Sequence, residues 1–385
     1  MTDLMAIARQ FQLPSEMVSI EPYGAGIIND TYRVTLRDDR TTEELSTEHS
    51  AGHPRLGKHA ILQRINGLVF PEPLKVMQNL DAVLSYAGEH ADTASVRAEF
   101  LLPPLYRTHN DKSYWQDEEA NVWRVMGFIE NTRSDNVLQN LQQAWEAGNA
   151  LGAFHRLVSE LPIDQLHDTL PGFHITPAYL RHYDQVAGQA PALPATSTDR
   201  TAIEFCTEVI ESNRTLADSL VNRQPPLTTR VMHGDPKLNN ILFDQETGKA
   251  VSIIDLDTVK PGLIQFDIAD CVRSCCNRSG ELPEDPDSVT FDMEVCRQIL
   301  DGYFIGAGDI LSYADVDSLT DAIQLLPYEL GVRFYSDYLA GNHYFKVSRP
   351  NDNLYRARTQ FVLLQSIQQQ REALANLMKE LRSSL

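Results

Sequence analysis

The stretch from residue 228 to residue 257 constrains this chain more than any other, because it predicts a β-hairpin with polar groups at both ends. Apolar residues at 241–243 and 250–254 flank a turn at 244–249, and Gly248 is a residue that such a turn favours. A polar loop precedes the first strand, and two acidic residues follow the second. The hairpin therefore holds a loop and a strand end, each rich in oxygen ligands, side by side.

The polar residues at these two places are spaced as phosphoryl transfer requires. That chemistry needs a carboxylate to orient the attacking hydroxyl and Mg²⁺ to bridge the phosphate oxygens. Asn240 lies five residues after Asp235, which is the spacing of kinase catalytic loops. Asp255 can hold Mg²⁺ together with Asn240, with Asp257 as a further or water-mediated ligand. Lys237, two residues after Asp235, can contact the transferring phosphoryl oxygens.

These residues resemble the catalytic segment of the aminoglycoside phosphotransferase and choline kinase superfamily, which shares the protein-kinase fold. The residues after Asp255 are Leu and Asp, where protein kinases have Phe and Gly. Further motifs, from residue 20 to about residue 340, are similar to those of bacterial N-acetylhexosamine 1-kinases within that superfamily. They are Ile20-Glu21-Pro22-Tyr23-Gly24, Trp123-Arg124-Val125, Phe128-Ile129-Glu130, Lys237-Leu238-Asn239-Asn240, Ile253 to Thr258, Arg333-Phe334 and Asp337-Tyr338-Leu339.

The resemblance implies an α+β, two-lobed, protein-kinase-like fold. We expect a nucleotide-binding lobe over residues 1–130, made of a small antiparallel sheet and a helix. Residues 131–385 are then a larger, mainly helical lobe that carries the catalytic hairpin and binds the acceptor. A chain of 385 residues also favours two lobes over one compact core.

The same resemblance implies an ATP site on the first lobe. Residues 23–29 take the place of the nucleotide-covering loop, and backbone groups of 126–130 take the place of the adenine-binding hinge. Gln63 stands where protein kinases have an ATP-binding Lys, so either Lys58 or Arg64 reaches the phosphates or Mg²⁺ carries more of the charge. The cofactor-binding residues expected on this basis are Tyr23, Gly24, Gly26, Gln63, Met126, Phe128 and Glu130.

On the acceptor side, Arg333 and Tyr344 match positions that resemble sugar-contacting residues of the N-acetylhexosamine kinases, together with Asp235. An internal salt bridge is the competing interpretation of Arg333. The function expected is ATP- and Mg²⁺-dependent phosphorylation of a sugar at the anomeric 1-hydroxyl of an N-acetylhexosamine or related hexose. Two alternatives remain open. One is a kinase of another alcohol, such as an aminoglycoside, choline or homoserine. The other is a catalytically inactive nucleotide-binding protein, supported only by the missing strand Lys.

Apolar periodicity predicts the remaining elements. Helices are expected at 4–11, 71–90, 144–161, 197–221, 325–345 and 354–381, and strands at 18–23, 31–36, 60–65, 95–100 and 122–129. Residues 37–58 are polar and predict an inserted loop. Asp267 and Asp270 open a further helix and are assigned to structure, because carboxylates in a first turn usually cap the helix and match its dipole. His155 is interpreted as a helix-surface or satisfied core residue.

Composition and charge exclude some functions. A net charge of −20 disfavours nucleic acid as a partner. Five cysteines without a disulfide or zinc spacing predict reduced thiols, with Cys271, Cys275 and Cys276 on a buried helix. No apolar segment is long enough for a membrane partner. We expect a cytoplasmic protein, monomeric or weakly dimeric, whose partners are ATP and a small sugar.

Overall fold

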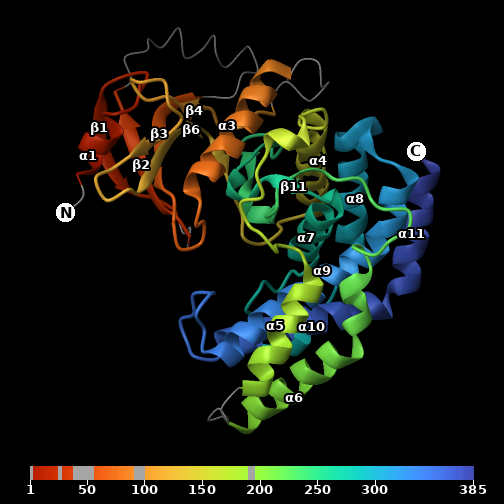
Figure 1. The fold of residues 1–385 in the computed structure, drawn as a ribbon. Helices are drawn as coiled ribbons and strands as arrows, with labels where there is room; N and C mark the ends of the chain where they lie inside the picture. The colour runs from red at the N-terminus through yellow and green to blue at the C-terminus, as the bar shows by residue number, and fades with distance from the viewer. Residues whose placement is uncertain (1–2, 25–27, 38–55, 91–99, 190–195) are drawn as a thin grey trace.

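The computed structural model describes residues 3–24, 28–37, 56–90, 100–189 and 196–385. Figure 1 shows two lobes, with the N-terminal sheet at the upper left and a larger helical lobe to the right and below. The expected α+β, protein-kinase-like architecture is confirmed. The lobe boundary at residue 130 stays a prediction.

The N-terminal lobe is an antiparallel sheet of order β1-β2-β3-β6-β4, with β5 also paired to β6. Its strands are β1 (Met17–Pro22), β2 (Asp30–Leu36), β3 (Leu56–Arg64), β4 (Leu105–Tyr106), β5 (Trp115–Gln116) and β6 (Val122–Ile129). A small core joins helix α1 (Leu4–Ala8) to this sheet through Ile7, Val34, Leu62 and Trp123. Helix α3 (Pro73–His90) belongs instead to the large core that it shares with the second lobe. The two lobes therefore share packing through α3.

Helices build most of the C-terminal lobe. They are α4 (Leu141–Leu157), α5 (Thr176–Gln189), α6 (Ser197–Ser212), α7 (Ile264–Cys276), α8 (Met293–Ala307), α9 (Tyr313–Ala340), α10 (Asp352–Gln369) and α11 (Arg371–Ser383). Helix α4 lies against α8 at a distance that only glycine permits. A Cβ at Gly148 would stand 1.9 Å from the carbonyl oxygen of Ile299, and one at Gly302 would stand 2.0 Å from that of Trp145.

The catalytic hairpin is present as predicted. Strand β9 (Ile241–Asp244) pairs with β10 (Ala250–Ile253) and with β7 (Thr132–Arg133), while β8 (Arg230–Met232) pairs with β11 (Lys260–Gly262). Short 3-10 turns follow the two polar segments, at Leu238–Asn240 and Leu256–Thr258. The strand end after β10 meets the N-terminal lobe, because Asp257 pairs there with Arg124 of β6.

Several element boundaries differ from those that the periodicity predicts. Helix α9 begins at Tyr313, twelve residues before the expected start, because Ser312 and Asp315 form a capping box there. It ends at Ala340 because Gly341 takes a left-handed conformation, with φ of 98°. The expected helix at 354–381 is two helices separated at Gln370, and α6 ends at Ser212 rather than near 221.

Other expectations fall wholly or partly outside the described residues. The strand at 95–100 and most of the insertion at 37–58 belong there. The five cysteines are free and buried, with three of them on α7 as expected. Among the described residues, no helix is long and apolar enough to cross a membrane.

Candidate active site

The catalytic loop begins at His233, immediately after β8, and its backbone can be made only with glycine at the next position. Gly234 has φ of 89°, and a Cβ on it would stand 2.7 Å from the carbonyl oxygen of Thr258. The hydroxyl of Thr258 donates to the carbonyl oxygen of His233 at 2.7 Å. The buried ring of His233 bonds through Nε2 to the carbonyl oxygen of Ile254 at 3.0 Å. These contacts tie the loop to the strand end after β10.

Asp267, on α7, binds the backbone at the start of the catalytic loop. Its carboxylate accepts hydrogen bonds from the backbone N–H groups of His233 (2.6 Å) and Gly234 (2.8 Å), and it lies 2.9 Å from Nε2 of His155. Tyr303 completes the chain, with its hydroxyl 2.8 Å from Nδ1 of His155. Burial opposes ionisation of Asp267, but His155 and the backbone donors overcome it, so its pKa is lowered.

Asp267 is therefore structural, as expected, but capping is the wrong reason for it. The N-cap position of α7 is Leu263, which makes no side-chain capping bond, and the Asp267 carboxylate serves another segment. A carboxylate near a helix start usually caps it, and only the position of the loop in space shows otherwise. His155 is a buried core residue with hydrogen-bond partners and not a helix-surface residue, which confirms one of the two interpretations expected for it.

Asp235 lies at the centre of the loop with two of the predicted site residues. Lys237 donates through Nζ to Oδ2 of Asp235 at 2.6 Å. The amide nitrogen of Asn240 donates to the backbone carbonyl of Asp235 at 2.8 Å and to its Oδ2 at 3.3 Å. Crowding by protein atoms opposes the charge on Lys237, but Asp235, and more weakly Asp255 and Asp270, raise its pKa. A carboxylate, an ammonium and an amide thus converge in one half-exposed place.

Asp255 follows β10 in a left-handed conformation, with φ of 66°. Its side chain is open to solvent, yet protein atoms crowd it, and this crowding, followed by the carboxylates of Asp257 and Asp235, raises its pKa to about 7. Because solvent reaches the Asp255 carboxylate, its raised pKa reflects repulsion by these two like charges more than burial. A divalent cation would offset them.

Mg²⁺ fits this donor set. The amide nitrogen of Asn240 is used by Asp235, which leaves the amide oxygen for a cation beside the Asp255 carboxylate. The described ranges contain no group of three His, Cys, Asp or Glu side chains gathered for a metal. Water and nucleotide oxygens would therefore supply the remaining ligands, as is usual for Mg²⁺.

Asp257 has different surroundings from Asp255, although the sequence groups the two. It is only 2% exposed, and its Oδ1 forms an ion pair with Arg124 of β6. Its Oδ2 accepts from the amide of Asn29 at 2.6 Å. Both oxygens are engaged by residues of the other lobe. These contacts support a role in joining the lobes, and a water-mediated role toward a metal stays a prediction.

Arg124 is the cation that the sequence reasoning missed. It lies directly opposite Gln63 in the β3–β6 ladder, and its Nε and Nη2 donate to Oε1 of Gln63 at 3.0 and 2.8 Å. Arg64, one of the expected substitutes for the strand Lys, pairs instead with Asp30 near the surface. The signal was available, because Arg124 is the lone charged residue in the otherwise apolar run 122–129.

Most of the other residues expected to contact the nucleotide lie at the end of β6 or pack against it. Tyr23 meets Phe128 edge to face, with ring centroids 5.7 Å apart. Glu130 lies 2.8 Å from Nδ1 of His59, so its side chain is engaged within the lobe. Met126 is half-buried and Gly24 has φ of 77°. Gly26 lies outside the described residues. Whether these residues bind nucleotide stays a prediction.

A comparison with protein families decides what this arrangement belongs to. The family described as "Phosphotransferase enzyme family" matches residues 19–286, which is more than half of the chain. The chain belongs to this family. Membership makes it a phosphotransferase.

Solved structures show the same fold at low sequence identity. An aminoglycoside phosphotransferase from Alicyclobacillus acidocaldarius is 15% identical with a TM-score of 0.60, over 97% of each chain. A microcompartment-associated aminopropanol kinase is 14% identical with a TM-score of 0.60, over 95% of this chain and 98% of its own. A spectinomycin phosphotransferase in complex with ADP and spectinomycin is 13% identical with a TM-score of 0.54, over 93% and 94%.

In this phosphotransferase, aromatic rings surround Arg333 of α9. Its guanidinium carbon lies between 5.1 and 6.0 Å from the ring centroids of Phe173, Tyr179, Tyr344 and Phe345. These distances are typical of cation–π contacts. Within the described residues, Arg333 forms no ion pair with a carboxylate, so the internal salt bridge considered for it is not formed. We call these four rings and Arg333 the arginine box.

One loop of the phosphotransferase completes the arginine box. The Asp337 carboxylate accepts from the backbone N–H groups of His343, Tyr344 and Phe345, each at 2.9 Å. Tyr344 is thereby held beside Arg333 while remaining 61% exposed. The sequence pointed to both residues, and the structure brings them together.

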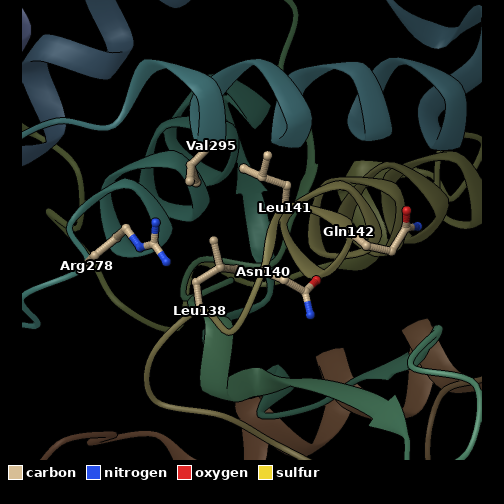
Figure 2. Close-up of a pocket in the computed structure, with 6 residues that line it drawn as sticks. All are labelled: Leu138, Asn140, Leu141, Gln142, Arg278 and Val295. Carbon is tan, nitrogen blue, oxygen red and sulfur yellow. The ribbon is translucent and has the colours of Figure 1, made fainter.

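A surface hollow of about 460 Å³ lies elsewhere on the phosphotransferase (Figure 2). Its lining residues are Leu138, Asn140, Leu141, Gln142, Arg278 and Val295. They come from the start of α4 and the residues before it, from the segment that follows α7, and from α8. None of the predicted catalytic or binding residues lines it. The convergence of charged groups around Asp235 is therefore a better guide to the active site than the size of a hollow.

Proposed function

We propose that this phosphotransferase transfers the γ-phosphoryl group of ATP to a sugar hydroxyl in the presence of Mg²⁺. The acceptor hydroxyl is the anomeric 1-hydroxyl of an N-acetylhexosamine or a related hexose. The observation that carries the reaction type is the convergence of Asp235, Lys237 and Asn240 beside Asp255. These four residues provide the base, the cation and the metal ligands that phosphoryl transfer needs.

The chain's own residues then have distinct roles. Asp235 accepts the hydroxyl proton as the sugar oxygen bonds to the γ-phosphorus and the bond from that phosphorus to the bridging oxygen of ADP breaks. Lys237 orients the Asp235 carboxylate and faces the transferring oxygens. Asn240 and Asp255 would hold Mg²⁺, which supplies charge neutralisation at the phosphates when bound. Arg124 keeps the lobes together through Asp257.

The arginine box supports a sugar over a cationic acceptor. An ammonium group is recognised by aromatic faces and by carboxylates. Here the aromatic faces are already occupied by a protein cation, which would repel an ammonium. Arg333 instead offers a fork of donors suited to hydroxyl and acetyl oxygens, and Tyr344 adds a hydroxyl. A choline-like or aminoglycoside-like acceptor is accordingly the second candidate, favoured only by the names of similar structures.

An ADP-release assay tests the proposal. The panel contains N-acetylhexosamines, free hexoses and amino alcohols, each with and without Mg²⁺, and Asp235→Asn serves as the inactive control. We expect Mg²⁺-dependent turnover with N-acetylhexosamines. Phosphorylation at the 1-hydroxyl removes the reducing end, so a reducing-sugar assay separates it from phosphorylation elsewhere on the ring. Turnover confined to amino alcohols would refute the sugar assignment, and no turnover with any acceptor would favour an inactive nucleotide-binding protein.

Two further properties belong to the same proposal. We expect a cytoplasmic enzyme, because ATP and sugar substrates are available there. We also expect a monomer or weak dimer, which sedimentation at two protein concentrations would test.

A further inference from the structure

The side chain of Asn29 bridges the two lobes. Its Nδ2 donates to Oδ2 of Asp257 at 2.6 Å, and its Oδ1 accepts from the backbone N–H of Asn66 at 3.0 Å. The side chain of Asn66 in turn donates through Nδ2 to the carbonyl oxygen of Ile28 at 3.0 Å. One amide therefore fastens together the residues before β2, the segment after β3 and the buried carboxylate that follows β10.

On the nucleotide side, Asn29 is the last residue of the segment expected to cover the phosphates. The backbone N–H of Tyr23 donates to the carbonyl oxygen of Thr31 at 2.9 Å, which joins the two ends of this segment. Thr31 also accepts at Oγ1 from Gln63 at 3.0 Å, and Gln63 accepts from Arg124. Because these bonds link β2, β3 and β6, the place where Asn29 is held sets the position of the sheet.

On the metal side, four consecutive residues after β10 serve three different places. Asp255, at the N-cap position of the 3-10 turn Leu256–Thr258, carries the carboxylate proposed to hold Mg²⁺. Asp257 meets the N-terminal lobe, and the Thr258 hydroxyl donates to the carbonyl oxygen of His233 at 2.7 Å. The turn fixes these residues relative to one another, so the contact at Asp257 sets how the sheet stands over Asp255 and the catalytic loop.

We propose that Asn29 is a positioning residue for the nucleotide. Its bridge to Asp257 holds the N-terminal sheet at the distance from Asp255 at which nucleotide and Mg²⁺ bind together. Without the bridge the lobes take other relative positions, the binding-competent fraction falls, and the apparent Kd rises by the inverse of that fraction. The inference rests on the proposed function for ATP and Mg²⁺, but not for the acceptor. The competing roles are a hydrogen bond that contributes only stability and an Asp257 that acts as a metal ligand.

Calorimetric titration of the folded proteins with ADP tests the bridge without requiring turnover. Asn29→Ala should raise the Kd for Mg²⁺–ADP about tenfold, which corresponds to a binding-competent fraction of about one tenth. The Kd for ADP without Mg²⁺ should change less than about twofold, because the sheet alone then holds the nucleotide. Asn121→Ala is the matched control, because Asn121 donates to Asp117 at 2.9 Å within the N-terminal lobe. It should lower thermal stability and leave both Kd values unchanged.

Exchanging the two side chains of the bridge gives a sharper test. Asn29→Asp sets a second carboxylate against Asp257, and the repulsion should raise the Kd for Mg²⁺–ADP about 100-fold. Adding Asp257→Asn reverses donor and acceptor, so the new amide donates to residue 29 while its oxygen accepts from Arg124. The exchanged protein should return to within about threefold of the wild-type Kd, because both hydrogen bonds are restored. Should Asn29→Asp alone fail to fold, Asn29→Ala and the exchanged protein still decide the question.

The outcomes separate this inference from the proposed function. Wild-type protein that binds no Mg²⁺–ADP refutes the proposed function. Wild-type protein that binds it, with an Asn29→Ala variant of lower Tm and unchanged Kd, overturns only the role of Asn29 and leaves a structural hydrogen bond. An exchanged protein that folds but binds Mg²⁺–ADP more weakly than Asn29→Ala assigns Asp257 to the metal and overturns the bridge.

Discussion

The two sides of the candidate site treat their arginines in opposite ways. On the nucleotide side, Arg124 is 1% exposed and spends its donors on Gln63 and Asp257. On the proposed acceptor side, Arg333 is surrounded by rings, and no carboxylate in the described part of the chain forms an ion pair with it. A buried cation whose three nitrogen atoms are all hydrogen-bonded to the protein, as in Arg124, holds elements in place. A cation with spare donors marks where a ligand is expected.

The largest effect should come from the one carboxylate that the proposed chemistry cannot replace. Asp235→Asn should lower kcat by about 10²- to 10⁴-fold, the range typical of a general base. The amide keeps the shape of the side chain, so the thermal midpoint and nucleotide affinity should stay close to those of wild type. Stopped-assay turnover and nucleotide binding are the measurements. Near wild-type turnover would remove Asp235 from the mechanism.

Arg124, the arginine whose nitrogen atoms are hydrogen-bonded within the protein, should matter for stability. Arg124→Met leaves Asp257 buried and unpaired, and we expect a loss of about 3–5 kcal/mol in the free energy of unfolding. Combining it with Asp257→Asn removes the stranded charge, so the double variant should be less destabilised than Arg124→Met alone. Denaturant unfolding of the three proteins gives the coupling. If the two single changes simply added, the buried ion pair would not be what joins the lobes.

Two carboxylates, Asp267 and Asp255, should make the stability of the protein depend on pH in opposite directions. The pKa of Asp267 is lowered in the folded protein, so its stabilisation is present above the ordinary value near 3.8 and is lost as the pH falls through the folded-state value. Asp267→Asn should therefore cost about 1–3 kcal/mol at pH 7, and the difference from wild type should shrink below pH 4. Unfolding curves between pH 3 and 7 test this. A difference that does not depend on pH would contradict the assigned charge.

Asp255 should show the opposite dependence and the smallest effect. Its pKa is raised to about 7, so the folded protein holds a proton that the unfolded chain releases near pH 4. Without Mg²⁺, stability should fall as the pH rises from about 4 to 7, and Asp255→Asn should abolish that fall. Because the side chain is exposed, a shift of a few degrees or less in Tm is expected. Adding Mg²⁺ should reduce this pH-dependent fall in stability in the wild-type protein, and it should have no such effect on Asp255→Asn.

Local pattern was sufficient for the catalytic hairpin. Alternating apolar runs, a Gly turn and the Asp235–Asn240 spacing lie within one short segment, and local contacts decide its shape. Helix ends were less predictable. The start of α9 depends on a capping box at Ser312, which lies outside the apolar pattern that was used to find the helix.

The sequence by itself indicated the reaction type, because the proposed base, amide and metal-binding carboxylate lie at short separations along one hairpin. Only the tertiary structure decided how neighbouring acidic residues divide their roles. Asp255 and Asp257 differ because one faces solvent and the other meets Arg124 from a strand 133 residues earlier. Asp267 reaches the loop 34 residues before it. Such partners are brought together by packing, and no pattern within a short window contains them.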